Sequence, residues 1–332
     1  MSSPVQPLVA AVQSGDRGAL ARAITLIEST AEGQQEEAQA LLEALLPHAR
    51  TGIRFGITGI PGVGKSTLID ALGIHLIGSG HQVAVLAVDP SSTRSGGSIL
   101  GDKTRMERLA VNDAAFVRPS ATGGAMGGVT RRTWEATILC EAAGYDRVII
   151  ETVGVGQSEL AVDRMTDLNV LMMIAGAGDE LQGIKRGIME MADVVVLNKC
   201  DGANTKACAS ARNDLLQAIQ LMPARSNGRR PYVLLCSATE GTGIAELALH
   251  LEQMADEDKT NGAFAERRRA QWTARLDSAI HDELSMAFAR DEGVQAMRAS
   301  LAVQVADGLL SPARAAARSV ALFRTGGAPP RE

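Results

Sequence analysis

The sequence predicts an α/β fold: a mainly parallel sheet flanked by helices, with helical extensions at both ends of the chain. The first observation is a series of short apolar runs that alternate with helical stretches. The second is that most runs are continuously apolar, as expected of strands covered on both faces. The third is that polar motifs follow these runs, where such sheets bind ligands. The expected strands are residues 53–58, 83–88, 115–118, 148–151, 170–174, 194–198 and 232–237.

Composition and charge exclude several classes of protein. Apolar residues make up 45% of the 332 residues, and the net charge is −5. This charge argues against a protein that binds nucleic acid through bulk positive charge. No apolar run has the length of a membrane helix, and the first residues lack the layout of a signal peptide. We therefore expect a cytoplasmic protein that binds neither nucleic acid nor membrane.

The cysteine pattern also favours a cytoplasmic protein. There are four, Cys140, Cys200, Cys208 and Cys236, and they include no C-x-x-C pair. Such a set is typical of reduced, mostly buried thiols in a reducing cytosol.

The chain divides into three expected regions. Residues 1–50 carry helical periodicity, with a break at Gly33, and form an N-terminal helical extension. Residues 51–255 form the α/β domain. Residues 256–332 form a C-terminal helical arm, which begins with a polar, linker-like stretch over 256–263. The basic run 267–269 opens a helix there, and we expect it to be a solvated helix face rather than a contact for anionic groups.

A phosphate-binding motif follows the first expected strand. Residues 59–66 read G-I-P-G-V-G-K-S and match G-x-x-x-x-G-K-[ST], with a helix start after them. Glycines let backbone N–H groups surround phosphate oxygens, Lys65 supplies a charge to the β- and γ-phosphates, and Ser66 offers a hydroxyl to Mg²⁺. The predicted nucleotide contacts here are Gly59, Ile60, Pro61, Gly62, Val63, Gly64, Lys65, Ser66 and Thr67.

A guanine-reading motif follows the strand at 194–198. Residues 198–201 read N-K-C-D, which matches N-K-x-D, so Asn198, Lys199 and Asp201 are predicted to bind the base. The Asp201 carboxylate would accept from guanine N1–H and the exocyclic amine, and adenine offers neither donor in that geometry. The predicted contacts of the loop that closes over the base are Ser237, Ala238 and Thr239.

Acidic residues at other strand ends predict a metal site. Glu151 occupies the place of the Asp in the D-x-x-G motif of most GTPases, and the Gly154 N–H is expected to meet the γ-phosphate. Asp89 follows the strand at 83–88, and Asp102 lies in a Gly- and Ser-rich loop suited to a switch. The predicted Mg²⁺ ligands are Ser66, Asp89, Asp102 and Glu151.

Three longer motifs carry a resemblance to a known family. They read V-D-P-S-S at 88–92, G-G-S-I-L-G-D-K-T-R-M at 96–106 and E-T-V-G-V-G-Q-S-E at 151–159. The chain resembles the MeaB/ArgK/MMAA family of P-loop GTPases, which chaperone adenosylcobalamin-dependent acyl-CoA mutases, chiefly methylmalonyl-CoA mutase. The resemblance implies a GTPase that gates delivery and removal of the mutase's cofactor and protects the mutase.

The resemblance also implies several structural features. Family members are homodimers that use the C-terminal extension, about residues 262–325 here, as a dimerisation arm. They are similar in placing the four predicted ligands around Mg²⁺. They also have a third mobile loop, matched by residues 176–187, in which Gln182 and Lys185 are candidates to act at the phosphates with Lys65 and Glu151.

Slow hydrolysis of GTP is expected from the protein alone. Many GTPases carry a water-positioning Gln directly after the D-x-x-G glycine, but here Val155 follows Gly154. Alternatives remain at this point: a GTPase metallochaperone for another metalloenzyme, a kinase of a transport-system protein, and a signalling module that only binds GTP.

Overall fold

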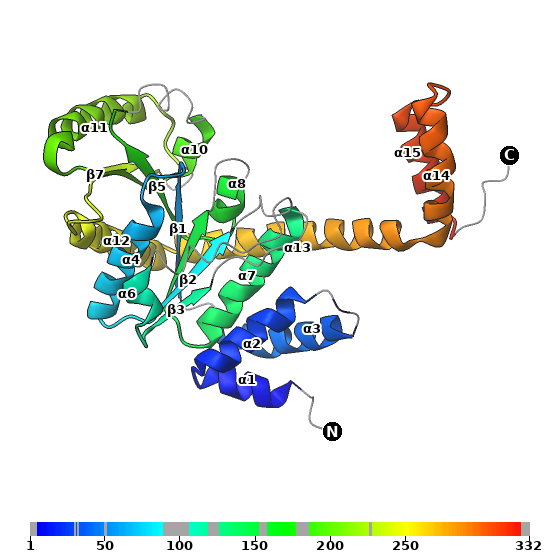
Figure 1. Cartoon of the computed structure of the whole chain (residues 1–332), viewed down its shortest axis with the longest axis horizontal. Coiled ribbons are helices and arrows are strands. Elements are labelled where there is room, and N and C mark those ends of the chain that lie inside the picture. The colour runs from blue at the N-terminus through cyan, green and yellow to red at the C-terminus, as the bar shows by residue number, and fades with distance from the viewer. Residues whose placement is uncertain are drawn as a thin grey trace. The chain divides into compact units, whose positions relative to one another are not determined.

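The computed structural model describes residues 5–29, 31, 33–49, 52–88, 106–118, 126–152, 158–176, 186–225 and 228–326. These residues form a seven-stranded sheet with helices on both faces (Figure 1). The strands are β1 (Ile53–Gly59), β2 (Val83–Val88), β3 (Ala115–Arg118), β4 (Arg147–Thr152), β5 (Leu168–Ile174), β6 (Val194–Asn198) and β7 (Tyr232–Leu235). They reproduce the predicted strands within two residues at either end.

The strand order positions the site. It is β3-β2-β4-β1-β5-β6-β7, and each neighbouring pair is parallel, which confirms the predicted sheet. β1 lies between β4 and β5, so strands β2–β4 lie on one side of it and β5–β7 on the other. Ligands of open α/β sheets bind at the carboxyl ends of the strands where the strand order changes direction, so the end of β1 is the expected position of the site.

Alternate residues of the strands fill separate cores on the two faces. Val170 and Met172 of β5 pack with α4 (Lys65–Gly78) and α12 (Ile244–Asn261). Leu171 and Met173 pack with α10 (Arg186–Met191) and α11 (Thr205–Gln220). This two-sided burial explains why the strands read as continuous apolar runs. The short α6 (Glu107–Ala110) also lies against α4, while α7 (Met126–Ala142) and α8 (Ser158–Asp163) contact β4.

The N-terminal extension is helical, as predicted. It comprises α1 (Gln6–Gln13), α2 (Arg17–Glu28), α3 (Gln34–Leu45) and the short 3₁₀ helix η1 (Leu46–His48), with Gly33 before α3 in a left-handed conformation. α2 and α3 pack against α7, burying Leu20, Ile24 and Leu41 completely. The extension is therefore part of the same compact body as the sheet.

The chain forms two compact units, Met1–Arg268 and Arg269–Glu332. The expected linker at 256–263 is wrong, because α12 continues to Asn261. Ala255 and Asp258 remain buried on its inner face, and Asp258 pairs with Arg229 at 2.8 Å. Gly262, with φ 85°, then separates α12 from α13 (Ala263–Arg290).

The second unit contains most of α13, α14 (Glu292–Ala306) and α15 (Pro312–Arg324). α14 packs along α15, and the rings of Phe288 and Phe323 meet edge to face at 5.4 Å. Helix α15 lies within the region expected to be helical, and Ser311 caps its start by accepting from the Arg314 N–H.

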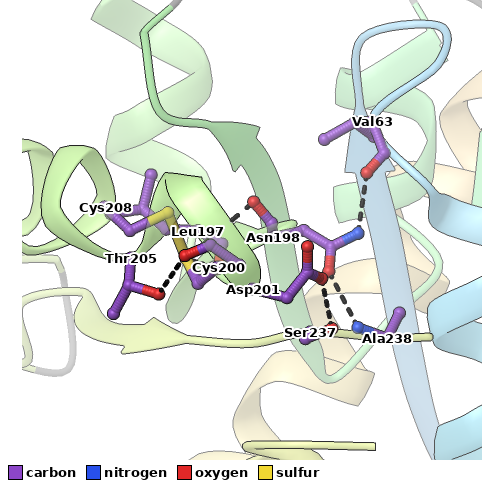
Figure 2. Close-up of a disulfide and its surroundings, with 10 residues drawn as sticks. Val63, Leu197, Asn198, Cys200, Asp201, Thr205, Cys208, Ser237 and Ala238 are labelled. Atoms are coloured by element: carbon purple, nitrogen blue, oxygen red, sulfur yellow. Dashed lines mark hydrogen bonds between the residues drawn. A yellow bond between two sulfur atoms is a disulfide. The ribbon is translucent and has the colours of Figure 1, made fainter. Parts of the chain in front are cut away.

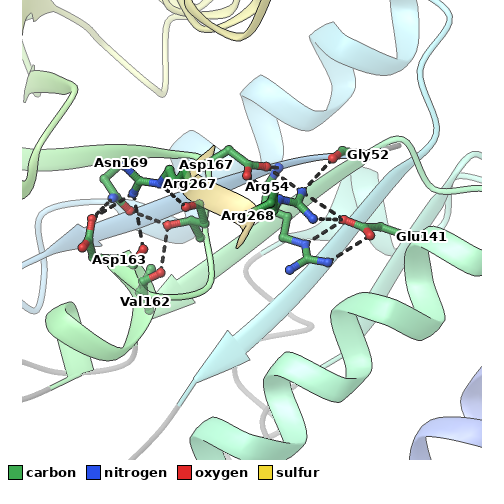
Figure 3. A network of polar contacts seen from close by, with 10 residues as sticks. Gly52, Arg54, Glu141, Val162, Asp163, Asp167, Asn169, Arg267 and Arg268 are labelled. Carbon is green, nitrogen blue, oxygen red and sulfur yellow. Dashed lines mark hydrogen bonds and ion pairs between the residues drawn. The ribbon is translucent and has the colours of Figure 1, made fainter. Parts of the chain in front are cut away.

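The expectation that the basic run 267–269 faces solvent is also wrong for Arg267 and Arg268 (Figure 3). Arg268 is 8% exposed and donates to both carboxylate oxygens of Asp167, at 2.5 and 2.7 Å. It also reaches Glu141, which forms a bidentate pair with Arg54 at 2.7 and 2.9 Å. Arg267 donates to Asp163 at 2.9 Å. These two arginines are held because carboxylates from the ends of α7 and α8, and from the residue before β5, lie within reach of them.

None of the helices in the described part of the chain combines the length and apolarity needed to cross a membrane.

Candidate nucleotide-binding site

The phosphate motif forms the turn between β1 and α4, as predicted. Gly64 has φ 98°, and a Cβ there would lie 2.6 Å from the side-chain nitrogen of Asn198. Gly59 has φ 150°, and a Cβ there would lie 2.6 Å from the carbonyl oxygen of Met172. Both positions therefore need glycine for conformation and for space.

Lys65 is the first residue of α4 and lies beneath this turn. Its side chain is buried, and Nζ donates to the carbonyls of Gly59 at 2.8 Å and Ile60 at 3.2 Å. A cation is thus held inside the loop, at the helix N-terminus where backbone N–H groups and the helix dipole favour an anion.

Ser66 and Glu151 come together from two adjacent elements. β4 pairs with β1 in the register Ile57↔Glu151, which brings the end of β4 beside the phosphate turn. The Ser66 hydroxyl donates to Glu151 Oε1 at 3.2 Å, and Glu151 is 4% exposed. A hydroxyl and a buried carboxylate at this distance form the kind of all-oxygen donor set that suits Mg²⁺.

Asn198 connects three parts of the site (Figure 2). Its side-chain nitrogen donates to the Val63 carbonyl at 2.8 Å, and its side-chain oxygen accepts from the Ala238 N–H at 3.1 Å. Asn198 is 2% exposed, so both bonds are shielded from water. The guanine motif, the phosphate loop and the 237–239 loop are therefore joined through one side chain.

Asp201 and Ser237, both predicted to contact the base, lie in contact with each other. The Ser237 hydroxyl donates to Asp201 Oδ2 at 2.5 Å and lies 3.3 Å from the Thr239 hydroxyl. Asp201 is half-buried, so its carboxylate remains reachable for a ligand. Lys199 has φ 59°, a left-handed conformation that costs about 1–2 kcal/mol for a residue with a Cβ. Strain at such a position is typical of binding sites.

The expectation of four reduced thiols is wrong for one pair. Cys200, within the guanine motif, forms a disulfide with Cys208 of α11, and their Cα atoms lie 5.8 Å apart. The pairing arises because α11 begins at Thr205 and brings its first turn back beside the motif. The signal in the sequence was the eight-residue spacing, which spans a turn and one helical turn.

The other two cysteines are free and buried, as predicted. Burial raises the pKa of the Cys236 thiol to about 12. Burial also raises the pKa of the Cys140 thiol well above its usual range. Both are therefore protonated thiols without nucleophilic character at neutral pH.

Five predicted site residues lie outside the described residues: Asp89, Asp102, Gly154, Gln182 and Lys185. The described residues bring together the remaining predicted contacts from the ends of β1, β4, β6 and β7. Two partners in the site were not predicted: the backbone carbonyl of Val63, which accepts from Asn198, and Cys208, which is disulfide-bonded to Cys200.

Comparisons with known proteins agree with this arrangement. The family described as "Methylmalonyl Co-A mutase-associated GTPase MeaB" matches residues 20–292. A probable GTPase of Mycobacterium tuberculosis is 53% identical over 315 residues, covering 94% of this chain and 93% of that protein. The GTPase ArgK of Escherichia coli is 44% identical over 302 residues, covering 91% of each chain.

A solved structure shares the whole fold. The crystal structure of an LAO/AO transport system kinase superposes with a TM-score of 0.76 at 35% identity, covering 98% of this chain and 99% of that one. The family match, the relatives and the shared P-loop fold agree with one another. The chain is a GTPase and belongs to the MeaB/ArgK/MMAA family of P-loop GTPases.

Proposed function

We propose that this GTPase is the chaperone of an adenosylcobalamin-dependent acyl-CoA mutase, with methylmalonyl-CoA mutase as the client. The GTPase would gate delivery and removal of the mutase's cofactor and protect the mutase. The observation that carries the proposal is the match of residues 20–292 to a family described as associated with methylmalonyl-CoA mutase. We also propose that it acts in the cytoplasm.

The nucleotide contacts follow from the geometry of the site. The phosphates would lie over the turn 59–64, against Lys65 and the first amides of α4, including that of Thr67. The guanine would lie between Lys199 and Ala238, with its N1–H and amine donating to Asp201. Ser237 holds Asp201 through a 2.5 Å hydrogen bond, which fixes the carboxylate for the base. An adenine there would leave this carboxylate without its donors.

Ser66 and Glu151 would hold Mg²⁺, together with Asp89 and Asp102 from the segments that follow β2. The bound ion would supply positive charge to the β- and γ-phosphate oxygens. Glu151 is suited to this role because it is 4% exposed and already lies 3.2 Å from the Ser66 hydroxyl. Lys65 would offset the charge that develops on the same oxygens.

Hydrolysis by the protein alone would be slow. Val155 stands where many GTPases carry the Gln that orients the attacking water. The partner would order Gly154 and the loop bearing Gln182 and Lys185, and so raise the rate. The nucleotide state would in turn bias these loops and hence the mutase's access to its cofactor.

The C-terminal arm, residues 256–332, would form the homodimer. Within the second compact unit, α13 exposes Leu276, Ile280 and Leu284 at 60, 50 and 57%. Their four-residue spacing places them along one side of the helix, as an apolar stripe suited to a second copy of this chain.

Two other functions remain as alternatives. The relative of known structure is described as a kinase of a transport system. A kinase would transfer phosphate to a protein acceptor rather than to water. A metallochaperone would need a cluster of side chains that binds the metal. Among the described residues, no cluster of three or more His, Cys, Asp or Glu side chains could hold a metal ion.

The test is GTP hydrolysis by the purified protein with and without the methylmalonyl-CoA mutase of the same organism. ATP in place of GTP and a Lys65→Ala variant are the controls. We expect a low GTP-specific rate that rises clearly with the mutase and is lost in the variant. A rate indifferent to the mutase would refute this client. Phosphate appearing on a protein rather than in solution would support the kinase.

A further inference from the structure

The Cys200–Cys208 disulfide crosses the segment that recognises guanine (Figure 2). Cys200 is the variable position of the N-K-x-D motif, and Asp201 follows it directly. The covalent loop closed by the bond contains Asp201 and the short 3₁₀ helix η2 (Gly202–Asn204). Any change in this bond therefore acts next to the carboxylate proposed to read the base.

The backbone on the amino side of the loop is strained and firmly held. Lys199 is the sole non-glycine residue with positive φ among the described residues. Asn198 is fixed by its bonds to Val63 and Ala238, and the Cys200 N–H donates to the Cys236 carbonyl at 3.0 Å. The left-handed turn thus persists because contacts on both sides of Lys199 impose it.

The carboxyl side of the loop is tied to the body of the protein differently. Residues 202–207 are exposed. The bonds from the Thr205 hydroxyl to the Gly202 carbonyl and from the Asn204 N–H to the Asp201 carbonyl lie within the segment itself. The Ser237–Asp201 hydrogen bond and the disulfide join the segment to its surroundings. Since the disulfide is covalent, it restricts the positions that Asp201 can adopt.

The two sulfur atoms differ in access. Cys208 is fully buried, whereas Cys200 is only partly buried at the edge of the core formed with Leu197. Because Cys200 is the less buried residue of the two, we expect an external thiolate to attack its sulfur, with Cys208 as the leaving group. Cys200 Sγ lies 3.2 Å from the Leu197 carbonyl, so the thiol formed on reduction has an acceptor in place. We therefore expect the reduced protein to keep its fold while the loop gains freedom.

We propose that this disulfide sets the affinity of the site for guanine nucleotides, and that thiol–disulfide exchange with a dithiol reductant lowers that affinity reversibly. The proposal rests on the placement of guanine at Asp201. The reductant's thiolate attacks Cys200 Sγ, the Cys200–Cys208 bond breaks, and Cys208 leaves as a thiolate and takes a proton. The reductant's second thiol then displaces Cys200, so the dithiol is oxidised to its disulfide and the protein gains two thiols and two electrons.

A redox-sensitive disulfide is consistent with the cytoplasmic location that we propose. Disulfides that occur in cytosolic proteins are usually transient and catalytic or redox-sensing, because the cytosol keeps thiols reduced. A partly exposed bond beside a ligand site is of that kind. Cys140 and Cys236 cannot substitute for it, since both thiols are buried and free.

The experiment compares GDP binding by the oxidised protein and by the same protein reduced with dithiothreitol, at a fixed Mg²⁺ concentration. We expect the dissociation constant for GDP to rise about threefold to tenfold on reduction, mainly through faster release, and to recover on reoxidation. A Cys200→Ser/Cys208→Ser double variant should match the reduced protein and ignore the reductant. The Cys140→Ala variant, which keeps the disulfide, should respond as the parent protein does.

The outcomes separate this inference from the assignment on which it rests. Equal GDP affinity in the two redox states would overturn the inference alone. So would four reactive thiols in the oxidised, denatured protein, or loss of the far-ultraviolet circular dichroism of the folded state on reduction. Failure to bind GDP in either state would overturn the placement of guanine as well.

Discussion

The side-chain nitrogen of Asn198 donates a 2.8 Å hydrogen bond to the backbone carbonyl of Val63, and this bond joins the guanine motif to the phosphate loop. The two motifs lie 135 residues apart in sequence, at the ends of β6 and β1. Because the other end of the same amide accepts from the Ala238 N–H, one residue fixes the distance between the sites for base and phosphate. We therefore expect recognition of the two ends of a nucleotide to be coupled through Asn198.

Replacing Asn198 with Ala should weaken both stability and binding. The change leaves the Val63 carbonyl and the Ala238 N–H buried without their partners, which costs about 1–3 kcal/mol of unfolding free energy. Urea unfolding measures this loss, and GDP titration measures the parallel drop in affinity. The matched control is Asn204→Ala, at an exposed position six residues further along the chain. It should leave the stability and the GDP affinity unchanged. Normal GDP affinity in Asn198→Ala would show that the coupling does not exist.

Two glycines of the phosphate loop should differ sharply in their tolerance of Ala. Gly62 and Gly64 both have positive φ, at 79° and 98°, so either substitution strains the backbone. A Cβ at Gly62 meets nothing within 4 Å, whereas one at Gly64 lies 2.6 Å from the Asn198 nitrogen. We expect Gly64→Ala to lose about tenfold more GDP affinity than Gly62→Ala, a difference of about 1.4 kcal/mol. Equal losses in the two variants would argue against the observed packing.

The buried carboxylates of Asp167 and Glu141 should make Arg268 essential to stability. Burial alone would lower the pKa of Arg268, but attraction to Asp167 and Glu141 raises it overall, so the side chain stays charged. Arg268→Ala leaves the buried Asp167 without its guanidinium, and breaking such a pair costs about 3–5 kcal/mol. Thermal unfolding measures the loss. The neighbouring Arg269 is exposed, and Arg269→Ala should change stability by less than about 0.5 kcal/mol.

The cysteines should react in two distinct classes. Burial raises the pKa of Cys236 to about 12 and also raises the pKa of Cys140, so iodoacetamide should modify neither in the folded protein near neutral pH. Mass spectrometry after denaturation without reductant should find two adducts, at the free cysteines, and four after reduction. Rapid labelling of Cys140 in the folded protein would contradict its complete burial.

The sheet could be predicted because its signal is local. Each strand is a continuous apolar run, and each motif is a short pattern at a strand end, so the positions of Lys65, Ser66, Glu151 and Asn198 in the fold could be predicted without knowledge of their contacts. Family resemblance indicated the fold of the whole chain. These features depend on neighbours in sequence, which a single chain displays directly.

The features that were missed depend on contacts between distant segments. Arg268 reads as a solvated residue in a basic run, yet its partners Asp167 and Glu141 lie 101 and 127 residues away. The polar stretch after residue 255 resembles a linker, but Arg229 pairs with Asp258 and keeps α12 helical. Burial and pairing of Arg268 and Asp258 are tertiary effects that no local pattern records.

We propose that Asp201 selects guanine at a site joined to the phosphate loop, and that this selection underlies both the activity and its control. The ratio of GDP to ADP affinity, measured for the parent protein and for Asp201→Ala, tests it. We expect the parent protein to prefer GDP by about 10⁴-fold or more, since a site built for particular donors rejects analogues that lack them. This preference should collapse in the variant. Similar affinity of the parent protein for the two nucleotides, or an unchanged ratio in Asp201→Ala, would show that Asp201 does not read the base.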